Sequence, residues 1–201
     1  MSRAAVVDAL VLAAGTSSRL GRLKQLLPYG DTTLLGHAIA TARAAGVRRV
    51  GVVVGAHAAD VAAEAMRARA DLVAENADWA AGMGSSLRVG TRVLTEEHAQ
   101  PPDALLVLLC DQPLVTSSDL QRLLAHGSDA VVASAYDGTT GVPALFPRHR
   151  FAALAALDGA TGAKALLRGA DVVRVECPSA AIDIDTEADW SRLAALAQVG
   201  S

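Results

Sequence analysis

Short apolar runs alternate with longer helical patterns along most of the chain, and this alternation limits the fold more than any other feature. Strand-like runs at 9–12, 47–54, 72–75 and 104–109 are separated by segments with the periodicity of helices. Continuous apolar runs of this length are typical of strands that are buried on both faces of a parallel sheet. The alternation predicts an α/β fold, a Rossmann-like three-layer sandwich with a mostly parallel central sheet.

The remaining elements follow from the same patterns and from turn and capping residues. The most apolar run, 104–109, is expected at the centre of the sheet. Further strands are expected at 130–135, 142–146 and 172–175. Helices are expected from Thr32 or Thr33 to 45, at 58–70, at 82–97, from Ser117 or Ser118 to 127, at 162–167 and from 187 onward. The segment 16–31 is expected to be a loop.

Composition narrows the class of protein. A chain of 201 residues favours a single domain over 1–201, and 52% hydrophobic residues are enough for a packed core. A formal net charge of −3 disfavours general nucleic-acid binding, which needs a basic face. No apolar run approaches the ~20 residues of a membrane span. Cys110 and Cys177 lack the spacing of a disulfide framework or a zinc site, which predicts reduced thiols and a cytoplasmic location.

The loop after the first apolar run has the composition of a phosphate-binding loop. It contains Leu12, Ala13, Ala14, Gly15, Thr16, Ser17, Ser18 and Arg19, and Lys24 follows. A glycine lets backbone amides approach an anion, and the hydroxyls add donors. The guanidinium offers a planar fork and the ammonium a point charge, so that together they can neutralise a triphosphate. The glycine spacing fits neither a Walker A loop nor GxGxxG. A polar loop with two solvated cations is the alternative.

Two aspartates are candidate metal ligands. Asp111 follows the run 104–109, and Asp185 follows an apolar-alternating piece at 181–184. Asp183 and Asp185 lie on either side of Ile184 and would share one face of a strand. Carboxylates at one edge of a sheet can meet and hold a hard cation. A carboxylate at the end of so apolar a run is costly without a partner, so a metal is favoured for Asp111 over a turn cap. For Asp185 a surface or helix-start role stays equally open.

Four segments, in this order, resemble one family. They are LAAGTSSRLGRLK at 12–24 followed by QLLPYG, Gly82-Met83-Gly84-Ser85-Ser86-Leu87, Leu109-Cys110-Asp111-Gln112-Pro113, and Asp183-Ile184-Asp185-Thr186 with Trp190. The pattern is similar to that of the MobA-like NTP transferases, and especially to their molybdenum cofactor cytidylyltransferase branch. The resemblance extends over nearly the whole chain.

The resemblance implies a nucleotide-diphospho-sugar transferase type of fold and a magnesium-dependent nucleotidyltransferase. CMP from CTP would pass to a phosphorylated acceptor, the molybdenum cofactor, with release of pyrophosphate, and a molybdenum enzyme or its chaperone would be a partner. The implied catalytic residues are Arg19, Lys24 and Asp111, and the implied Mg²⁺ ligands are Asp111 and Asp185. The implied substrate-binding residues are Leu12, Ala13, Ala14, Gly15, Thr16, Ser17, Ser18, Gly82, Met83, Ser85, Ser86 and Pro143.

Departures from the family pattern leave the acceptor and base open. Val142 replaces the histidine of a GHP element, Ala160 and Lys164 alter a GDxGAR element, and Gly84 stands where serine is common. The alternatives are a guanylyltransferase, a transferase to another phosphorylated metabolite, a non-catalytic nucleotide- or cofactor-binding maturation protein, and a small oxidoreductase. The intact cations and aspartates favour catalysis over binding alone. The absence of GxGxxG disfavours a dinucleotide-dependent oxidoreductase.

Overall fold

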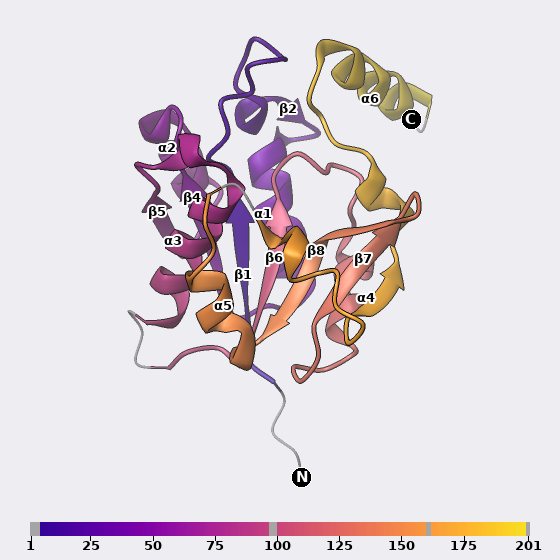
Figure 1. The fold of residues 1–201 in the computed structure, drawn as a ribbon. Helices are drawn as coiled ribbons and strands as arrows, with labels where there is room; N and C mark the ends of the chain where they lie inside the picture. Colours follow the sequence, from indigo (N-terminus) through magenta and orange to yellow (C-terminus); the bar gives the residue numbers. More distant parts are fainter. Residues whose placement is uncertain (1–4, 97–99, 160–161, 200–201) are drawn as a thin grey trace.

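Seven strands form one central sheet in the structure, a computed structural model that describes residues 5–96, 100–159 and 162–199 (Figure 1). They are β1 (Val7–Leu12), β4 (Val50–Val54), β5 (Leu72–Glu75), β6 (Ala104–Leu109), β7 (Val132–Tyr136), β8 (Thr139–Pro147) and β9 (Val173–Glu176). Their order is β5-β4-β1-β6-β8-β7-β9. Within this sheet β8 alone runs against its neighbours. The mostly parallel sheet and the central place of 104–109 are therefore confirmed.

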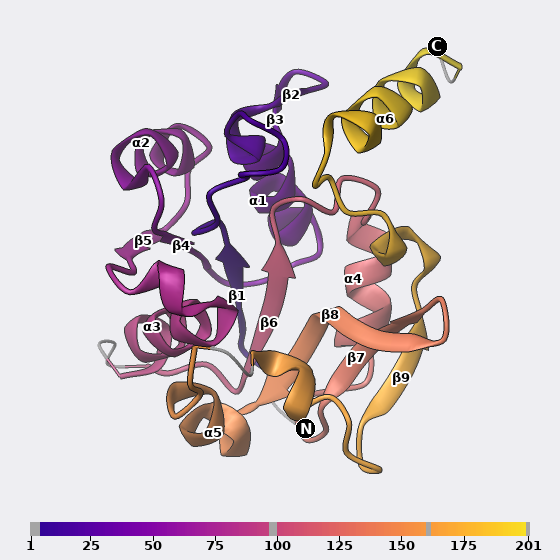
Figure 2. The same cartoon turned by 45° about the horizontal axis from the view of Figure 1, so that its top comes forward.

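Helices cover both faces of the sheet, which confirms the three-layer architecture (Figures 1 and 2). The helices are α1 (Leu34–Ala44), α2 (Ala58–Arg67), α3 (Met83–Thr95), α4 (Ser117–Leu124), α5 (Phe151–Ala155) and α6 (Glu187–Val199). Side chains of α1, α2 and α4 pack into one core, and those of α3 and α5 pack into the other. None of the described helices combines the length and apolar character needed to cross a membrane.

The last helix lies outside these layers, beside the loop that carries the small strands β2 (Pro28–Tyr29) and β3 (Thr32–Thr33) (Figure 2). Leu193 of α6 packs with Leu20, Leu27 and Ile184 in a separate small core. This contact joins the C-terminal segment to the loop after β1, although the two are far apart in the sequence. Both segments contribute to the site described below.

Capping side chains mark the starts of two helices, α1 and α4. Thr33, one of the two expected caps, accepts a hydrogen bond from the Gly36 amide at 3.0 Å and begins α1. The expected cap at Ser117 or Ser118 is wrong, because Thr116 caps α4 instead. The Thr116 hydroxyl accepts from the amide of Asp119, and the Asp119 carboxylate accepts from the amide of Thr116. This reciprocal capping box is available only at Thr116.

Several local expectations are also wrong. The segment 16–31, expected to be a loop, contains a 3-10 helix η1 (Lys24–Leu26) and β2. The strand expected at 181–184 is absent, because Pro178 begins a 3-10 helix, η5 (Pro178–Ala181), and no ladder partner follows. The helix expected at 162–167 is only η4 (Ala163–Ala165). The other 3-10 helices are η2 (Trp79–Ala81) and η3 (Arg148–Arg150). Helix α5 was not expected, because five residues carry too little periodicity.

A buried carboxylate joins β1 to the start of β4. The Asp8 side chain is fully buried and accepts hydrogen bonds of 2.6–3.1 Å from the guanidinium groups of Arg48 and Arg49. The two arginines come directly before β4, which explains why this strand begins at Val50 and not at Val47 as expected. A carboxylate without solvent is stable only when such partners satisfy it.

We therefore expect Asp8→Asn to destabilise the fold. Removing one partner of a buried ion pair costs roughly 3–5 kcal/mol, and because both arginines are partly exposed we expect a decrease of about 2 kcal/mol in the free energy of unfolding. Urea denaturation followed by circular dichroism measures this decrease. The matched control is Asp129→Asn, at an exposed position before β7. Equal stabilities of the two variants would show that the Asp8 cluster contributes nothing.

Candidate active site

A cleft of about 340 Å³ opens where β1 and β6 end. Its lining residues are Leu12, Ala13, Ala14, Gly15, Thr16, Lys24, Gln25, Trp79, Ala80, Gly82, Met83, Ser86, Leu109, Cys110 and Asp111. Most of the site residues expected from the sequence are among them. Open α/β sheets bind ligands at this edge, because loops leave the carboxyl ends of neighbouring parallel strands there.

The loop after β1 is held by a buried glutamine that sequence reasoning did not assign to the site. The Gln25 side-chain amide donates to the carbonyls of Ala13 at 3.0 Å and Gly15 at 2.8 Å. The Ser17 hydroxyl donates to Gln25 at 3.4 Å and accepts from the Lys24 amide at 3.1 Å. Ser17 therefore serves the loop itself and does not line the cleft. The position of Gln25 directly after Lys24 was the available signal.

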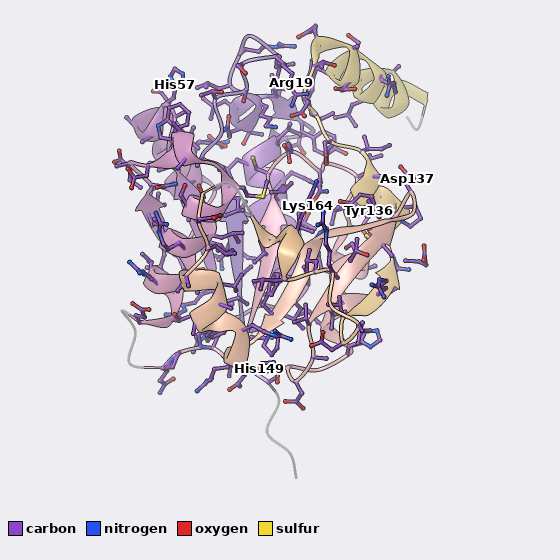
Figure 3. The ribbon with its side chains drawn as sticks, viewed as in Figure 1. Arg19, His57, Tyr136, Asp137, His149 and Lys164 are labelled. Atoms are coloured by element: carbon purple, nitrogen blue, oxygen red, sulfur yellow. The ribbon has the colours of Figure 1, made fainter. Side chains whose placement is uncertain are left out.

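A cluster of opposite charges lies at one side of the cleft. The Lys24 ammonium donates to the Asp111 carboxylate and, at 2.8 Å, to Asp185. The exposed Arg19 guanidinium donates to the other oxygen of Asp185 at 2.9 Å. Figure 3 shows Arg19 on the loop after β1, at the top of the view. The structure thus brings together all four charged residues that the sequence singled out, although Arg19 and Asp185 do not line the cleft.

The pKa values in this cluster reflect the pairing. Burial acts to lower the pKa of Lys24, but the charge of Asp111 and the hydrogen bonds to both carboxylates raise it above its ordinary value. The hydrogen bond from Lys24 is the main reason that the pKa of Asp185 is lowered. Burial and then the charge of Asp111 raise the pKa of Asp183 to about 6. The ammonium of Lys24 therefore neutralises acids that would otherwise repel one another.

A backbone contact places Asp185 in this cluster. The Ile184 amide donates to the carbonyl of Asp111 at 2.9 Å, and the Ile184 side chain is fully buried. The segment at 182–185 therefore lies against the end of β6 without forming a strand. Asp185 reaches the site by this contact and by its ion pairs, and not by the strand alternation that the sequence suggested.

The two carboxylates fit a hard divalent cation. Oδ1 of Asp111 is buried and has no hydrogen-bond partner among the described residues, so one oxygen of this carboxylate stays unsatisfied. The described residues hold no group of three or more His, Cys, Asp or Glu side chains placed to bind one metal ion. Mg²⁺ commonly binds one or two carboxylates together with phosphate oxygens and waters, which matches a site with two aspartates.

The first turn of α3 forms the opposite wall of the cleft. Ser86 lines the cleft, whereas Ser85 is fully buried and donates to the Gly82 carbonyl at 2.7 Å. Asn76 donates to both hydroxyls, at 2.8 Å to Ser85 and 3.0 Å to Ser86. Asn76 was not assigned from the sequence, and it holds this turn in place. The hydrogen bonds of Ser85 keep the turn closed and leave its side chain away from the cleft.

Close packing against the backbone of 158–159 explains why position 84 is a glycine and not a serine. A Cβ atom there would lie 1.8 Å from the carbonyl oxygen of Asp158, and the Gly84 amide donates to the Gly159 carbonyl at 3.2 Å. A serine at this position would force the two segments apart. The replacement therefore accommodates the segment that precedes η4.

The remaining expected residues lie outside the cleft. Ser18 is exposed on the loop after β1. Pro143 is buried in β8, where its carbonyl accepts from the Ser134 hydroxyl at 2.8 Å. Val142 is buried as well, Lys164 is exposed on η4, and Ala160 lies outside the described residues.

Other residues line the cleft without having been expected there. Trp79, Ala80, Leu109 and Cys110 join Gln25 in this group, and the sequence had suggested only a packing role for Trp79. Cys110 and Cys177 are buried free thiols, as expected. Burial raises the pKa of Cys110, so its thiol is a poor nucleophile.

Comparison with known proteins gives the following similarities. The MobA-like NTP transferase domain matches residues 9–175. The nicotine blue oxidoreductase of Paenarthrobacter nicotinovorans is 33% identical, over 93% of this chain and 96% of that protein. The Rv0371c protein of Mycobacterium tuberculosis is 34% identical, with a TM-score of 0.78 over 94% of this chain and 97% of that one. A second structure of Rv0371c is a complex with manganese. It is 32% identical, covers 94% of this chain and 97% of its own, and has a TM-score of 0.74.

A more distant structure supports the fold alone. A nucleotidyl transferase from Methanothermobacter is 24% identical, covers 94% of this chain and 95% of its own, and has a TM-score of 0.78. The expected nucleotide-diphospho-sugar transferase type of fold is confirmed by these neighbours.

We expect Gln25→Leu to loosen the loop after β1. The change leaves the carbonyls of Ala13 and Gly15 without their donor, at roughly 1–3 kcal/mol for each buried unsatisfied group. Amide hydrogen exchange at 13–18 should therefore accelerate by about tenfold or more. The control is Gln121→Leu, which removes an exposed amide from α4. Unchanged exchange at 13–18 would show that Gln25 does not hold the loop.

Proposed function

The chain belongs to the MobA-like NTP transferase family, and on that basis we propose a specific transfer reaction. A nucleoside monophosphate, CMP from CTP in the first instance, passes to a phosphorylated acceptor, and pyrophosphate leaves. The molybdenum cofactor is the first candidate acceptor. One observation carries this proposal: Lys24, Asp111 and Asp185 form a charge cluster beside a glycine-containing loop. Both border a cleft at the carboxyl ends of parallel strands, where open α/β sheets bind ligands.

The triphosphate would bind along the loop after β1. The exposed backbone at Gly15 and Thr16 can approach phosphate oxygens closely. The Lys24 ammonium would exchange its carboxylate partners for phosphate oxygens. Arg19, which donates to the same Asp185 as Lys24, would offer a planar fork for the same purpose. Both cations would then neutralise charge that grows on the leaving pyrophosphate. Positioning and charge stabilisation of this kind account for most of the catalysis in phosphoryl transfer.

The acceptor needs no protein nucleophile. A phosphate monoester has a second pKa of about 6 and is largely ionised at neutral pH. One of its oxygens would attack the α-phosphorus and form a new phosphoanhydride, while the bond to the β-phosphate breaks and pyrophosphate leaves with the electron pair. The described cleft lacks an activated nucleophile, since the thiol of Cys110 is buried and protonated.

We propose Mg²⁺ as the cofactor and Asp111 and Asp185 as the side chains that hold it. When bound, such an ion neutralises triphosphate oxygens. Two observations support this assignment. Oδ1 of Asp111 has no hydrogen-bond partner among the described residues, and both aspartates already contact one positive charge, the Lys24 ammonium. The manganese complex of Rv0371c supports a divalent ion in a related protein.

A cytosine base and the cytoplasmic location are also proposals. The similarity of 82–87 and 110–113 to the cytidylyltransferase branch favours CTP over GTP. Trp79 and Met83 line the cleft and offer apolar surface that a base could contact. The family departure at Val142 keeps other phosphorylated acceptors open, and a molybdenum enzyme or its chaperone would receive the product.

An oxidoreductase is the second candidate, because the nicotine blue oxidoreductase matches nearly the whole chain. Such an enzyme would need a redox cofactor. The glycines of the loop after β1 have the wrong spacing for the usual dinucleotide fingerprint, and two paired acids are an unfavourable setting for anionic ligands without a metal. These features favour the transferase.

Thermal shift with CTP, GTP and NADPH, each with and without Mg²⁺, separates these functions. We expect CTP with Mg²⁺ to raise the melting temperature most, because a ligand that binds only the folded state stabilises it by about 2.7 kcal/mol at a hundred times its Kd. If NADPH raises the melting temperature and neither CTP nor GTP does so with Mg²⁺, the transferase is contradicted. A response to GTP that equals the response to CTP would contradict the base preference only.

We expect Asp111→Asn to separate a metal ligand from a structural group. Asparagine keeps the shape but loses the charge, so pyrophosphate release with CTP and the molybdenum cofactor should fall by about a hundredfold, which corresponds to ~2.7 kcal/mol. The concentration of Mg²⁺ needed for half-maximal activity should rise. The control is Asp137→Asn, at a left-handed turn position that asparagine tolerates. An early-melting variant with normal turnover and Mg²⁺ dependence would show that Asp111 only caps the strand.

A further inference from the structure

A second cleft, of about 280 Å³, lies on the hairpin side of the sheet and outside the lining of the first. It is bounded by the β7–β8 turn, by η4 with the residues after it, and by β9. Both central residues of the turn, Asp137 and Gly138, have positive φ, which suits a tight two-residue hairpin. Figure 3 shows Lys164 in front of the sheet, near this hairpin in the view, with Tyr136 and Asp137 labelled on it.

The polar lining of this cleft is entirely basic or neutral. Its charged lining residues are Lys164, Arg168 and Arg174, and all three are exposed. None of them forms an ion pair with a carboxylate among the described residues, and the nearby acids Asp137 and Glu176 do not line the cleft. In a chain of net charge −3, three cations without counter-charges in one hollow create a local positive potential that attracts an anion.

The donors of this cleft are partly preorganised. The Arg174 Nε donates to the Thr140 hydroxyl at 3.3 Å, which orients the guanidinium and leaves its terminal nitrogens available. Leu167 is buried beneath the cleft and anchors the segment that carries Lys164 and Arg168. A planar guanidinium beside an ammonium matches the oxygens of a phosphate group.

A short wall connects the two clefts. The 3-10 helix η4 contacts both α3 and β8. A Cβ atom at Gly162, just before η4, would lie 4.0 Å from the Cβ of Met83, which lines the first cleft. A ligand that passes over this wall could place one group beside Lys24 and Asp111 and a second group beside Lys164.

We propose that this basic cleft binds an oxyanion of phosphate type on the acceptor, at the end away from the reacting phosphate. The inference rests on the proposed transfer reaction, and it adds that the acceptor carries a second anionic group. Lys164 and Arg168 are the residues that would bind this group, with Arg174 oriented by Thr140. The volume of the cleft exceeds that of the oxyanion alone, so the cleft also accommodates the part of the acceptor that carries it.

Titration of the ¹⁵N-labelled protein with inorganic phosphate at constant ionic strength tests the anion site. We expect saturable shifts of the amides of Thr139, Thr140 and Lys164. The variant Lys164→Gln/Arg168→Gln should bind phosphate at this site at least about tenfold more weakly, as expected for lost charged hydrogen bonds. The control Arg69→Gln/Arg92→Gln removes the same charge from exposed arginines elsewhere and should bind like the wild type. Equal weakening in both variants, or shifts confined to 13–18, would overturn the site.

Two further measurements separate this inference from the proposed function. The Lys164→Gln/Arg168→Gln variant should keep the affinity of the wild type for CTP with Mg²⁺, because the first cleft is intact. With an acceptor that supports pyrophosphate release, the variant should raise KM for the acceptor by about tenfold and leave KM for CTP unchanged. An unchanged KM for the acceptor would overturn the assignment to the acceptor. Failure of CTP to bind even the wild type would reject the proposed function, and the phosphate titration would still test the basic cleft.

Discussion

The pairing of Lys24 with Asp111 and Asp185 is the interaction on which the arrangement of the site depends. Three segments meet there, namely the loop after β1, the end of β6 and the chain before α6. Two carboxylates this close repel each other unless a cation lies between them, and the lysine supplies it. The same constraint underlies the proposed chemistry, in which Asp111 and Asp185 would hold the divalent ion and the Lys24 ammonium would bind phosphate oxygens.

The supporting structure consists of polar contacts that fix backbone. Gln25 holds the carbonyls of Ala13 and Gly15, Asn76 holds the first turn of α3, and the Ile184 amide binds the carbonyl of Asp111. None of these groups carries charge. They keep the loops at the sheet edge in one conformation, which a site for a flexible triphosphate needs because preorganised donors lose little entropy on binding.

Much of the fold could be predicted from the sequence, because apolar runs and helix caps are local signals. The run 104–109 identified the central strand, and the end of this run placed Asp111 at the carboxyl end of that strand. The pairing of Lys24 with Asp185 spans 161 positions, and no local pattern encodes such a contact. The role of Gln25 and the irregular backbone at 182–185 were missed for the same reason. The resemblance to a family singled out charged residues that the structure brings together, but it did not reveal that they pair with one another.

Family membership leaves the reaction open, because one fold can support unrelated chemistry and a relative of this chain is named an oxidoreductase. The most direct test is a crystal structure with Mn²⁺ and a non-hydrolysable CTP analogue, in which anomalous scattering locates the metal. We expect the Mn²⁺ signal between the carboxylates of Asp111 and Asp185, with the Lys24 ammonium moved onto the triphosphate. A structure in which Lys24 stays between the two carboxylates, and the metal and nucleotide lie elsewhere, would contradict the proposed site.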